Sequence, residues 1–463
     1  MVFSSLLFLG IFLPATLILY NLSKNITYKN VILVLSSVIF YAWGEPKLVL
    51  LLVFTAFIGY LSGLIIDKYN GRRQAKMALI GALVICLGSL GMFKYSGFVV
   101  ENFNFLFGTD FSFAGFALPL GISFYTFQIL SYVIDIYRGD VGLQKSFLKF
   151  MTYVSMFPQL VAGPIVRYID IEKQIENRKV TLEKFESGTL RFCQGLLKKV
   201  VLANSAGQIA DALLGGDLLS SSSATAWLGI IFYTFQIYFD FSGYSDLAIG
   251  MGRFFGFEFM ENFTYPYIST SITDFWRRWH ISLSTFFRDS VYIPLGGNRK
   301  HQIFNIAVVW MLTGLWHGAS WNFILWGTFY GIVLIIEKKA FGGALLKMPR
   351  WLGHIYSMVI VVLGWALFYF TDFTKLKNFF VCAFGGTGNF LDYTAKSTFF
   401  SNIWLLIILA VSSTPLLKIL FKKATKIKYI GKFVPAIGII FAMSICFALL
   451  VGQTYNAFLY FRF

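Results

Sequence analysis

Apolar segments long enough to cross a lipid bilayer recur along the whole chain. A spanning helix needs about 20 mostly apolar residues to cross a hydrocarbon core of about 30 Å. Candidate spans, some of them shorter than this, lie at residues 3–20, 31–43, 48–65, 77–100, 113–136, 224–251, 303–336, 355–369, 403–420 and 434–451, with weaker ones at 147–165 and 200–214.

The composition points the same way. The chain is 57% hydrophobic and only 13% charged, whereas a soluble domain of this length carries more charge on its surface. We therefore predict an all-α, polytopic integral membrane protein with about 11 transmembrane helices and additional re-entrant or interfacial helices. Residues 1–463 are expected to form a single transmembrane domain.

Membrane orientation explains the positive charge of the chain. The formal net charge is +17, and the Lys and Arg residues gather in short loops between apolar segments, as cytoplasmic loops of membrane proteins do. A basic rim also attracts anionic lipid headgroups or a phosphate-rich donor. The chain has no nucleic-acid-binding motif, and its four cysteines lack metal-ligand spacing. We expect neither nucleic-acid binding nor metal or disulfide chemistry.

Loop charges predict where the chain turns back. Residues 67–76 and 167–199 are rich in Lys and Arg and should both be cytoplasmic. Two loops lie on the same side only if the chain crosses the membrane an even number of times between them. Segment 147–165 must therefore enter the membrane and return instead of crossing. Pro158 and Pro164 favour this path because proline interrupts a helix.

The same count of membrane crossings requires residues 303–336 to start and end on the cytoplasmic side. About 34 residues, at a rise of 1.5 Å each, allow two passes of only about 25 Å. A short hairpin or broken helix is therefore expected, with His317 near its turn. An ionisable side chain is costly in an apolar stretch, and burial should keep this imidazole neutral. A neutral imidazole in a dry pocket is a competent general base for a hydroxyl.

Small and aromatic residues surround His317 in the string GLWHGASW. Gly314 and Gly318, four residues apart, would let another backbone approach closely, and Trp316 and Trp321 would wall a narrow cavity. These residues support a second interpretation equally well, in which the glycines form a packing face and His317 only hydrogen-bonds a neighbouring helix.

His280 ends the string TDFWRRWH, whose aromatic and basic residues are typical of an amphipathic helix at the cytoplasmic membrane surface. A surface-anchoring helix is the simpler interpretation of this string. Nearby residues are nevertheless candidates for lining a tunnel or holding the phosphates of a nucleotide-like donor. These candidates are Trp276, Arg278, Arg288, Arg299 and Lys300.

A further polar string, YFDFSGYSDLAIGMG, lies in a predicted span. Asp240 and Asp246 are six residues apart, so they point to different faces of a helix, which argues against an acid–base pair. We expect Ser242 and Asp246, four residues apart, to be the closer couple. A structural polar network is the favoured role of this string.

Four strings together resemble the membrane-bound O-acyltransferase family. They are FPQLVAGPIVRY, FDFSGYSDLAIGMG, WRRWHISLSTFFRDSVYIPLGGNR and GLWHGASWNFILWG, and the likeness continues to the terminal FLYFRF, where Arg462 replaces an expected neutral polar residue. The likeness is strongest to the branch of alginate O-acetylase membrane subunits and other polysaccharide O-acetylation proteins. It implies a ring of tilted helices around a central funnel.

The resemblance also implies a function. His317 matches the family's near-essential histidine, and His280 matches its second, more variably required one. Members pass an acyl group from a cytoplasmic thioester toward the other membrane face. Here the donor is expected to be acetyl-CoA, as a co-substrate and not a tightly bound cofactor.

The expected surroundings follow from the same resemblance. They are the bacterial inner (cytoplasmic) membrane and its lipids, an extracytoplasmic SGNH-type acetyltransferase as partner, and a polysaccharide as final acceptor. Residues 455–463 are the candidate docking segment for that partner.

Three alternatives stay open. The nearest is a D-alanyl or other acyl transferase fed by a carrier protein. A polysaccharide-related transporter or flippase would also contain broken helices, although transporters usually show paired repeats and the His-bearing hairpin has no second copy in this sequence. A non-enzymatic scaffold would tolerate the loss of His317.

Overall fold

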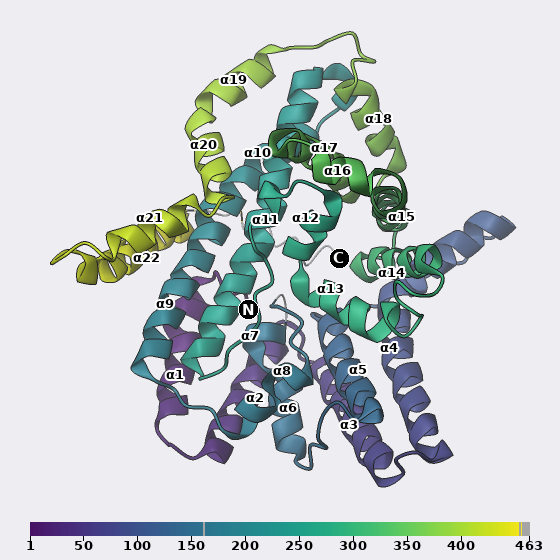
Figure 1. Cartoon of the computed structure of the whole chain (residues 1–463), viewed down its shortest axis with the longest axis vertical. Coiled ribbons are helices and arrows are strands. Elements are labelled where there is room, and N and C mark those ends of the chain that lie inside the picture. Colours follow the sequence, from purple (N-terminus) through teal and green to yellow (C-terminus); the bar gives the residue numbers. More distant parts are fainter. Residues whose placement is uncertain (161–162, 453–454, 456–463) are drawn as a thin grey trace. The chain divides into compact units, whose positions relative to one another are not determined.

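Every secondary-structure element that the computed structural model describes, over residues 1–160, 163–452 and 455, is a helix (Figure 1). The predicted all-α class is thereby confirmed. Contacts divide the chain into two compact units, residues 1–192 with 244–261 and residues 193–243 with 262–463. The single transmembrane domain stays a prediction.

The first unit contains the amino-terminal helices. They are η1 (Phe8–Phe12), α1 (Leu13–Asn21), α2 (Ile26–Gly44), α3 (Val49–Lys68), α4 (Arg73–Phe107), α5 (Ile122–Arg138), α6 (Phe147–Ser155), α7 (Phe157–Leu160) and α8 (Tyr168–Glu176). Asn25 begins α2, because its side-chain oxygen accepts hydrogen bonds from the backbone N–H groups of Thr27 and Tyr28. Gly108 ends α4 in the left-handed conformation, at φ +64°.

Helices α9 (Leu182–Leu197) and α11 (Ser223–Phe254) each contain a boundary between the units. The remaining elements belong to the second unit. They are η2 (Lys198–Ala203), α10 (Asn204–Leu214), η3 (Leu218–Ser220), η4 (Pro266–Ile268), α12 (Ile272–Arg278), α13 (Ile281–Phe287), η5 (Arg288–Tyr292), α14 (Gln302–His317), α15 (Trp321–Ile336), η6 (Glu337–Phe341), α16 (Gly342–Lys347), α17 (Arg350–Tyr369), α18 (Phe373–Ala383), α19 (Tyr393–Ser401), α20 (Ile403–Ser412), α21 (Leu416–Ala424), η7 (Gly431–Phe433) and α22 (Val434–Gly452).

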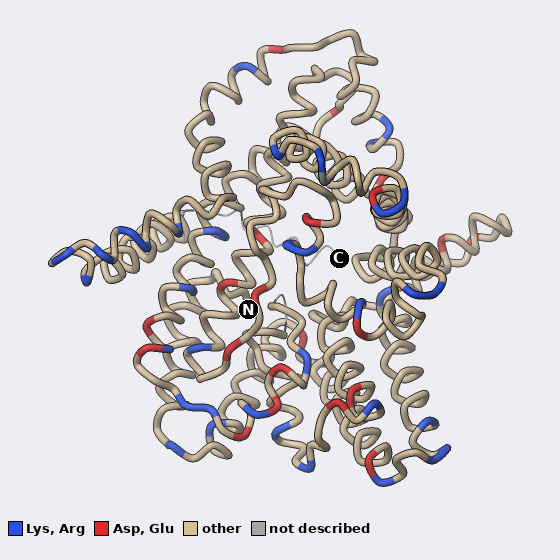
Figure 2. Tube along the Cα trace, in the orientation of Figure 1, with Lys and Arg blue, Asp and Glu red and all other residues tan. Residues whose placement is uncertain are grey.

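Several helices are suited to a bilayer. Among the described residues, five helical segments, namely α2, α3, α4, α17 and η7 with α22, are long and apolar enough to cross it, and the pair α19 and α20, bent by 61°, would make a sixth. Figure 2 shows Lys and Arg mainly in loops and at helix ends, as in α3, whose charged residues stand at its carboxyl end. The number of about 11 spans and the central funnel stay predictions.

Two predicted spans differ from the structure. The span at 113–136 begins only at Ile122, because Pro119 lacks an N–H group and Gly121 adopts a left-handed conformation at φ +70°. The span at 403–420 is divided between α20 and α21, with Pro415 at the break.

The predicted interruption of segment 147–165 is present. Helix α6 ends at Ser155, and the short α7 follows.

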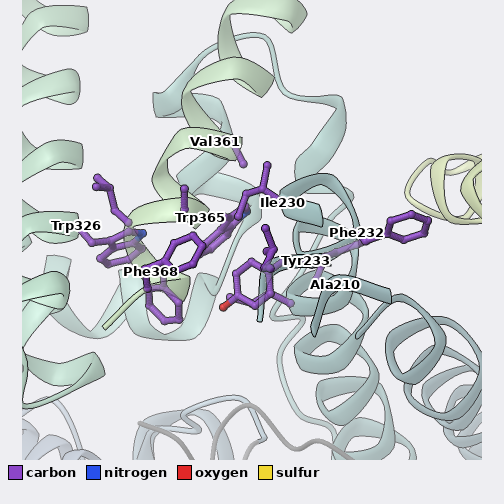
Figure 3. Packing of buried hydrophobic residues seen from close by; sticks show 14 of the residues in the cluster. Ala210, Ile230, Phe232, Tyr233, Trp326, Val361, Trp365 and Phe368 are labelled. Carbon is purple, nitrogen blue, oxygen red and sulfur yellow. The ribbon is translucent and has the colours of Figure 1, made fainter. Parts of the chain in front are cut away.

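Aromatic side chains form the core of the second unit. Figure 3 shows Trp326 of α15 near Trp365 and Phe368 of α17. The ring of Trp326 lies 6.3 Å from that of Trp365 and 5.3 Å from that of Phe368. Large rings bury much apolar area with few rotatable bonds, so they hold α15 and α17 in a fixed relation. The candidate active site is built against this core.

Candidate active site

Helices α14 and α15 form the hairpin that the sequence predicts, and His317 is the last residue of α14. The two helices pack closely because glycines face each other across them. A Cβ atom on Gly314 would overlap the carbonyl oxygen of Phe323, and one on Gly327 would overlap that of Trp310. The glycines are therefore a packing face, and this face fixes the end of α14 where the imidazole stands.

Aromatic rings surround the His317 imidazole, which is only 7% exposed. Its ring centre lies 4.9 Å from Trp316, 4.9 Å from Trp326 and 5.2 Å from Phe368. All three rings meet the imidazole edge to face. Trp316 and Trp326 thus enclose His317 within the aromatic core.

His280 is buried, contrary to the interpretation of its string as a surface-anchoring helix. It is 1% exposed and lies between α12 and α13, in a left-handed conformation at φ +45°. The aromatic residues of α12 face inward, since Phe275 is fully buried and Trp276 is 9% exposed. The sequence misled because aromatic residues that pack a core have the same spacing as those that anchor a helix to a membrane surface.

The two ring nitrogens of His280 have different surroundings. Nδ1 lies 3.2 Å from Oδ1 of Asn262, whereas Nε2 is buried with no hydrogen-bond partner among the described residues. Burial lowers the pKa of His280 to about 3, so the ring is neutral at physiological pH.

One cavity of about 270 Å³ brings the two histidines together. Trp316 also lies beside both, since its ring centre is 5.6 Å from His280 and 4.9 Å from His317. Three cations and two indoles, those of Trp276 and Trp310, line the cavity, whereas Trp316 does not. The polar and aromatic lining residues that concern us are Trp276, Arg277, His280, Arg288, His317 and Lys338.

Several predicted site residues lie elsewhere. Arg278 is not in the cavity wall, and its guanidinium donates hydrogen bonds to Asp274 and to the carbonyl oxygen of Thr264. Arg299 and Lys300 are exposed in the turn before α14. Trp321, at the start of α15, is 51% exposed and does not line this cavity. Arg462 and most of segment 455–463 lie outside the described residues.

Sequence reasoning missed a buried carboxylate that positions α12. Glu337 is 3% exposed and accepts hydrogen bonds from the N–H groups of Ile272 and Thr273, at 2.6 and 2.8 Å, and from the hydroxyls of Thr273 and Tyr356. It therefore caps the helix that carries Trp276. The one available signal was an acidic residue directly after an apolar helix.

Arg277 and Lys338 were also missed. Arg277 adjoins the predicted Arg278, and residue type alone does not tell which of two neighbouring arginines lines the cavity. Lys338 directly follows the hairpin in sequence, at a place where membrane orientation alone explains a cation.

The polar string of α11 forms ion pairs within each unit. In the second unit, Asp240 accepts a hydrogen bond from Lys199 at 2.6 Å, with both side chains buried. In the first, Asp246 pairs with Arg191 at 2.7 Å. The favoured role as a structural network is therefore supported, whereas Asp246 has a cation and not Ser242 as its partner.

Comparisons with known proteins identify the family. Residues 142–373 match the membrane-bound O-acyltransferase family. The chain is 46% identical to the probable alginate O-acetylase AlgI of Azotobacter vinelandii, over 80% of this chain and 75% of that one. It is 36% identical to the peptidoglycan O-acetyltransferase of Helicobacter pylori, over 80% and 77%.

More distant relatives carry another acyl group in their names. The teichoic acid D-alanyltransferase of Streptococcus thermophilus is 33% identical over 47% of this chain and 56% of that one. The matched family segment contains both cavity histidines, and the likeness to the O-acetylases covers most of the chain. The chain therefore belongs to the membrane-bound O-acyltransferase family and is an integral membrane O-acyltransferase.

Proposed function

We propose that this protein transfers an acetyl group from cytoplasmic acetyl-CoA toward the O-acetylation of a cell-surface or exported polysaccharide. The observation that carries the proposal is one cavity with two histidines and three cations in its wall. Imidazoles accept protons from hydroxyls, and cations bind phosphates. Acyl transfer from a phosphate-bearing thioester requires both functions within reach of one another.

The donor phosphates are assigned to the cations of the cavity wall, Arg277, Arg288 and Lys338. In this assignment Arg277 and Lys338 take the role that was predicted for Arg278, Arg299 and Lys300, which lie outside the cavity. Burial, together with the neighbouring charges of Arg277 and Lys339, lowers the pKa of Lys338. A phosphate bound among these side chains would offset their mutual repulsion.

His317 is the proposed general base. It accepts the proton of an acceptor hydroxyl while the hydroxyl oxygen attacks the carbonyl carbon of the thioester. The tetrahedral intermediate then collapses, the carbon–sulfur bond breaks, and the imidazolium returns the proton to the departing thiolate. The products are an acetyl ester and the free thiol, and no further reactant is needed.

His280 is proposed to orient a reactant and not to serve as the main base. A pKa of about 3 makes its ring a weak proton acceptor at equilibrium. Its Nε2 nevertheless has a buried position without a protein partner among the described residues. A hydrogen bond from the donor or the acceptor hydroxyl would satisfy that atom.

The names of the relatives support a polysaccharide acceptor, because they include alginate and peptidoglycan O-acetylation proteins. We propose that an extracytoplasmic SGNH-type acetyltransferase completes the transfer and that the protein resides in the bacterial inner membrane. D-alanyl transfer is the second candidate, favoured by the likeness to teichoic acid D-alanyltransferases.

Transfer from radiolabelled acetyl-CoA by the purified protein in detergent tests the proposal. His317→Ala should lower the rate by about 10²-fold or more, because it removes the base. His354→Ala is a matched control, since Nδ1 of this half-buried histidine donates to the backbone carbonyl oxygen of Ser269, outside the cavity.

All variants are first compared with wild type by thermal unfolding to show that they are folded. A folded His317→Ala variant with the wild-type rate would refute the enzymatic role of this residue. Label transferred from D-alanyl carrier protein but not from acetyl-CoA would favour the second candidate.

A further inference from the structure

Asn262 contacts the turn at His280, where α13 begins. Its side chain is fully buried, and Oδ1 lies 3.1 Å from the backbone nitrogen of Ser282, 2.9 Å from the Ser282 hydroxyl and 3.2 Å from Nδ1 of His280. Its own carbonyl oxygen accepts a hydrogen bond from the N–H of Ile281 at 3.0 Å. Both the side chain and the backbone of Asn262 therefore contact the segment that begins α13.

These contacts determine which way the Asn262 amide points. A backbone N–H group can only donate, so the atom facing the nitrogen of Ser282 must be the amide oxygen and not the amide nitrogen. The same oxygen faces Nδ1 of His280. The Ser282 hydroxyl also lies 3.4 Å from Nδ1, but its hydrogen is donated to Oδ1 of Asn262, so it too presents an acceptor to the ring. An acceptor at that position requires Nδ1 to carry the proton, which leaves Nε2 with a lone pair.

The backbone of His280 needs such support. A residue other than glycine in the left-handed region costs about 1 kcal/mol or more, and His280 stands there at φ +45°. The hydrogen bonds that Asn262 accepts from Ile281 and Ser282 stabilise this turn. His280 lines the cavity, and its ring contacts Asn262 through Nδ1.

We propose that Asn262 is a positioning residue that fixes His280 as the Nδ1–H tautomer, so that the Nε2 lone pair faces the reactants in the cavity. This inference rests on the proposed function. Since Nδ1 is engaged, Nε2 is the ring nitrogen left for a ligand. In this tautomer Nε2 accepts a hydrogen bond from a hydroxyl or amide N–H group of a reactant but donates none.

The charges around the ring agree with a neutral tautomer. Burial is the cause of the lowered pKa of His280. The charged and titratable groups of the same cavity wall are the cations Arg277, Arg288 and Lys338, together with Tyr292 and His317. Asn262 places an uncharged amide against Nδ1, whereas a carboxylate at that place would favour the protonated ring.

Nitrogen NMR of the intact protein, with ¹⁵N in its four histidines, reads the tautomer directly. The His280 signals are assigned by their loss in His280→Gln. We expect a protonated Nδ1 and an unprotonated Nε2 in wild type, and a shift toward Nε2–H in Asn262→Leu with a drop in kcat of about 10²-fold. Ser282→Ala, which removes another donor to the same oxygen, should retain both the tautomer and the rate.

Asn262→Asp keeps an acceptor at the same place and guards against a leucine variant that fails to fold. It should retain the Nδ1–H tautomer and move the acidic limb of the pH–rate profile upward, because a carboxylate raises the pKa of the imidazole. A wild-type Nε2–H tautomer, or an unchanged pH profile in Asn262→Asp, would overturn the inference. The NMR measurement does not require catalysis, so it tests the tautomer independently of the proposed function. The absence of transfer from acetyl-CoA would refute the proposed function and leave the tautomer measurement unaffected.

Discussion

The two histidines reach the same cavity from regions built on different principles. His317 stands at the end of a glycine-packed hairpin, among the rings of Trp316, Trp326 and Phe368. His280 stands in a short strained turn that hydrogen bonds from Asn262 hold in place. Shape fixes the first side chain, and directional polar contacts fix the second.

The difference teaches what each kind of support can control. Ring packing sets the place of an imidazole closely, but it acts alike on both tautomers. A hydrogen bond to one nitrogen also selects where the proton resides. In the proposed mechanism, His317 exchanges a proton and His280 only orients a reactant. Ring packing leaves His317 free to change its protonation state, and the hydrogen bond to Asn262 keeps His280 in one tautomer.

The largest loss of activity is expected from a substitution in the hairpin. Gly327→Ala places a methyl group against the carbonyl oxygen of Trp310, so α14 and α15 must separate and His317 must move. A displacement of about 1 Å in a catalytic group lowers rates by about 10²-fold. We expect a loss of this size in acetyl transfer.

Gly331→Ala provides the matched control, one turn further along α15. There the added atom would lie 3.2 Å from a Cβ atom of Trp310, which a small shift relieves. Equal activity of the two alanine variants would show that the close approach at Gly327 does not position His317.

Glu337 links the two regions, because it follows the hairpin and caps the helix that leads to His280. Glu337→Gln keeps the size but loses the charge and one of two accepting oxygens, so the N–H groups of Ile272 and Thr273 lose an acceptor. We expect a loss of about 1–3 kcal/mol in the free energy of unfolding.

Glu258→Gln, at an ion pair whose carboxylate is 64% exposed, should change stability by no more than about 0.5 kcal/mol. Thermal unfolding in detergent measures both variants. The anchoring role of Glu337 is wrong if the two variants unfold alike.

Much of the fold could be predicted, because apolar length and loop charge are direct consequences of the bilayer. The hairpin at 303–336 followed from parity and length, and the structure contains it. The exact helix ends did not follow, since Pro119 and Pro415 act through local backbone geometry inside apolar stretches.

The site was less accessible to sequence reasoning. His317 could be singled out as an ionisable group in an apolar segment. The contributions of Asn262, Glu337 and Lys338 depend on contacts between segments distant in sequence, and no spacing rule reveals them. Arg278 was chosen over Arg277 because residue type does not say which side of α12 faces the cavity.

A pH experiment sharpens the comparison at His280. Its pKa is about 3 when folded, against an ordinary value of 6.5, so the unfolded chain binds a proton that the folded chain does not. The associated stability is complete above pH 6.5 and is lost as the pH falls from 6.5 toward 3, by about 2 kcal/mol at pH 5. Thermal unfolding at pH 7 and pH 5 should show a smaller loss for His280→Gln than for wild type. Equal losses would mean that the buried imidazole does not resist protonation.

The smallest expected effect concerns the cations between the two regions. Arg277→Gln removes a cation from the cavity wall, whereas Arg278→Gln removes one that pairs with Asp274 outside it. A charge-assisted contact to a donor phosphate contributes about 1.5 kcal/mol or more, so Arg277→Gln should raise KM for acetyl-CoA about tenfold with little change in kcat. Arg278→Gln should leave KM within about twofold, because its partly exposed ion pair with Asp274 lies outside the cavity. If Arg278→Gln raises KM more than Arg277→Gln, the donor lies along the outer face of α12, and the cavity shared by His280 and His317 is not where its phosphates bind.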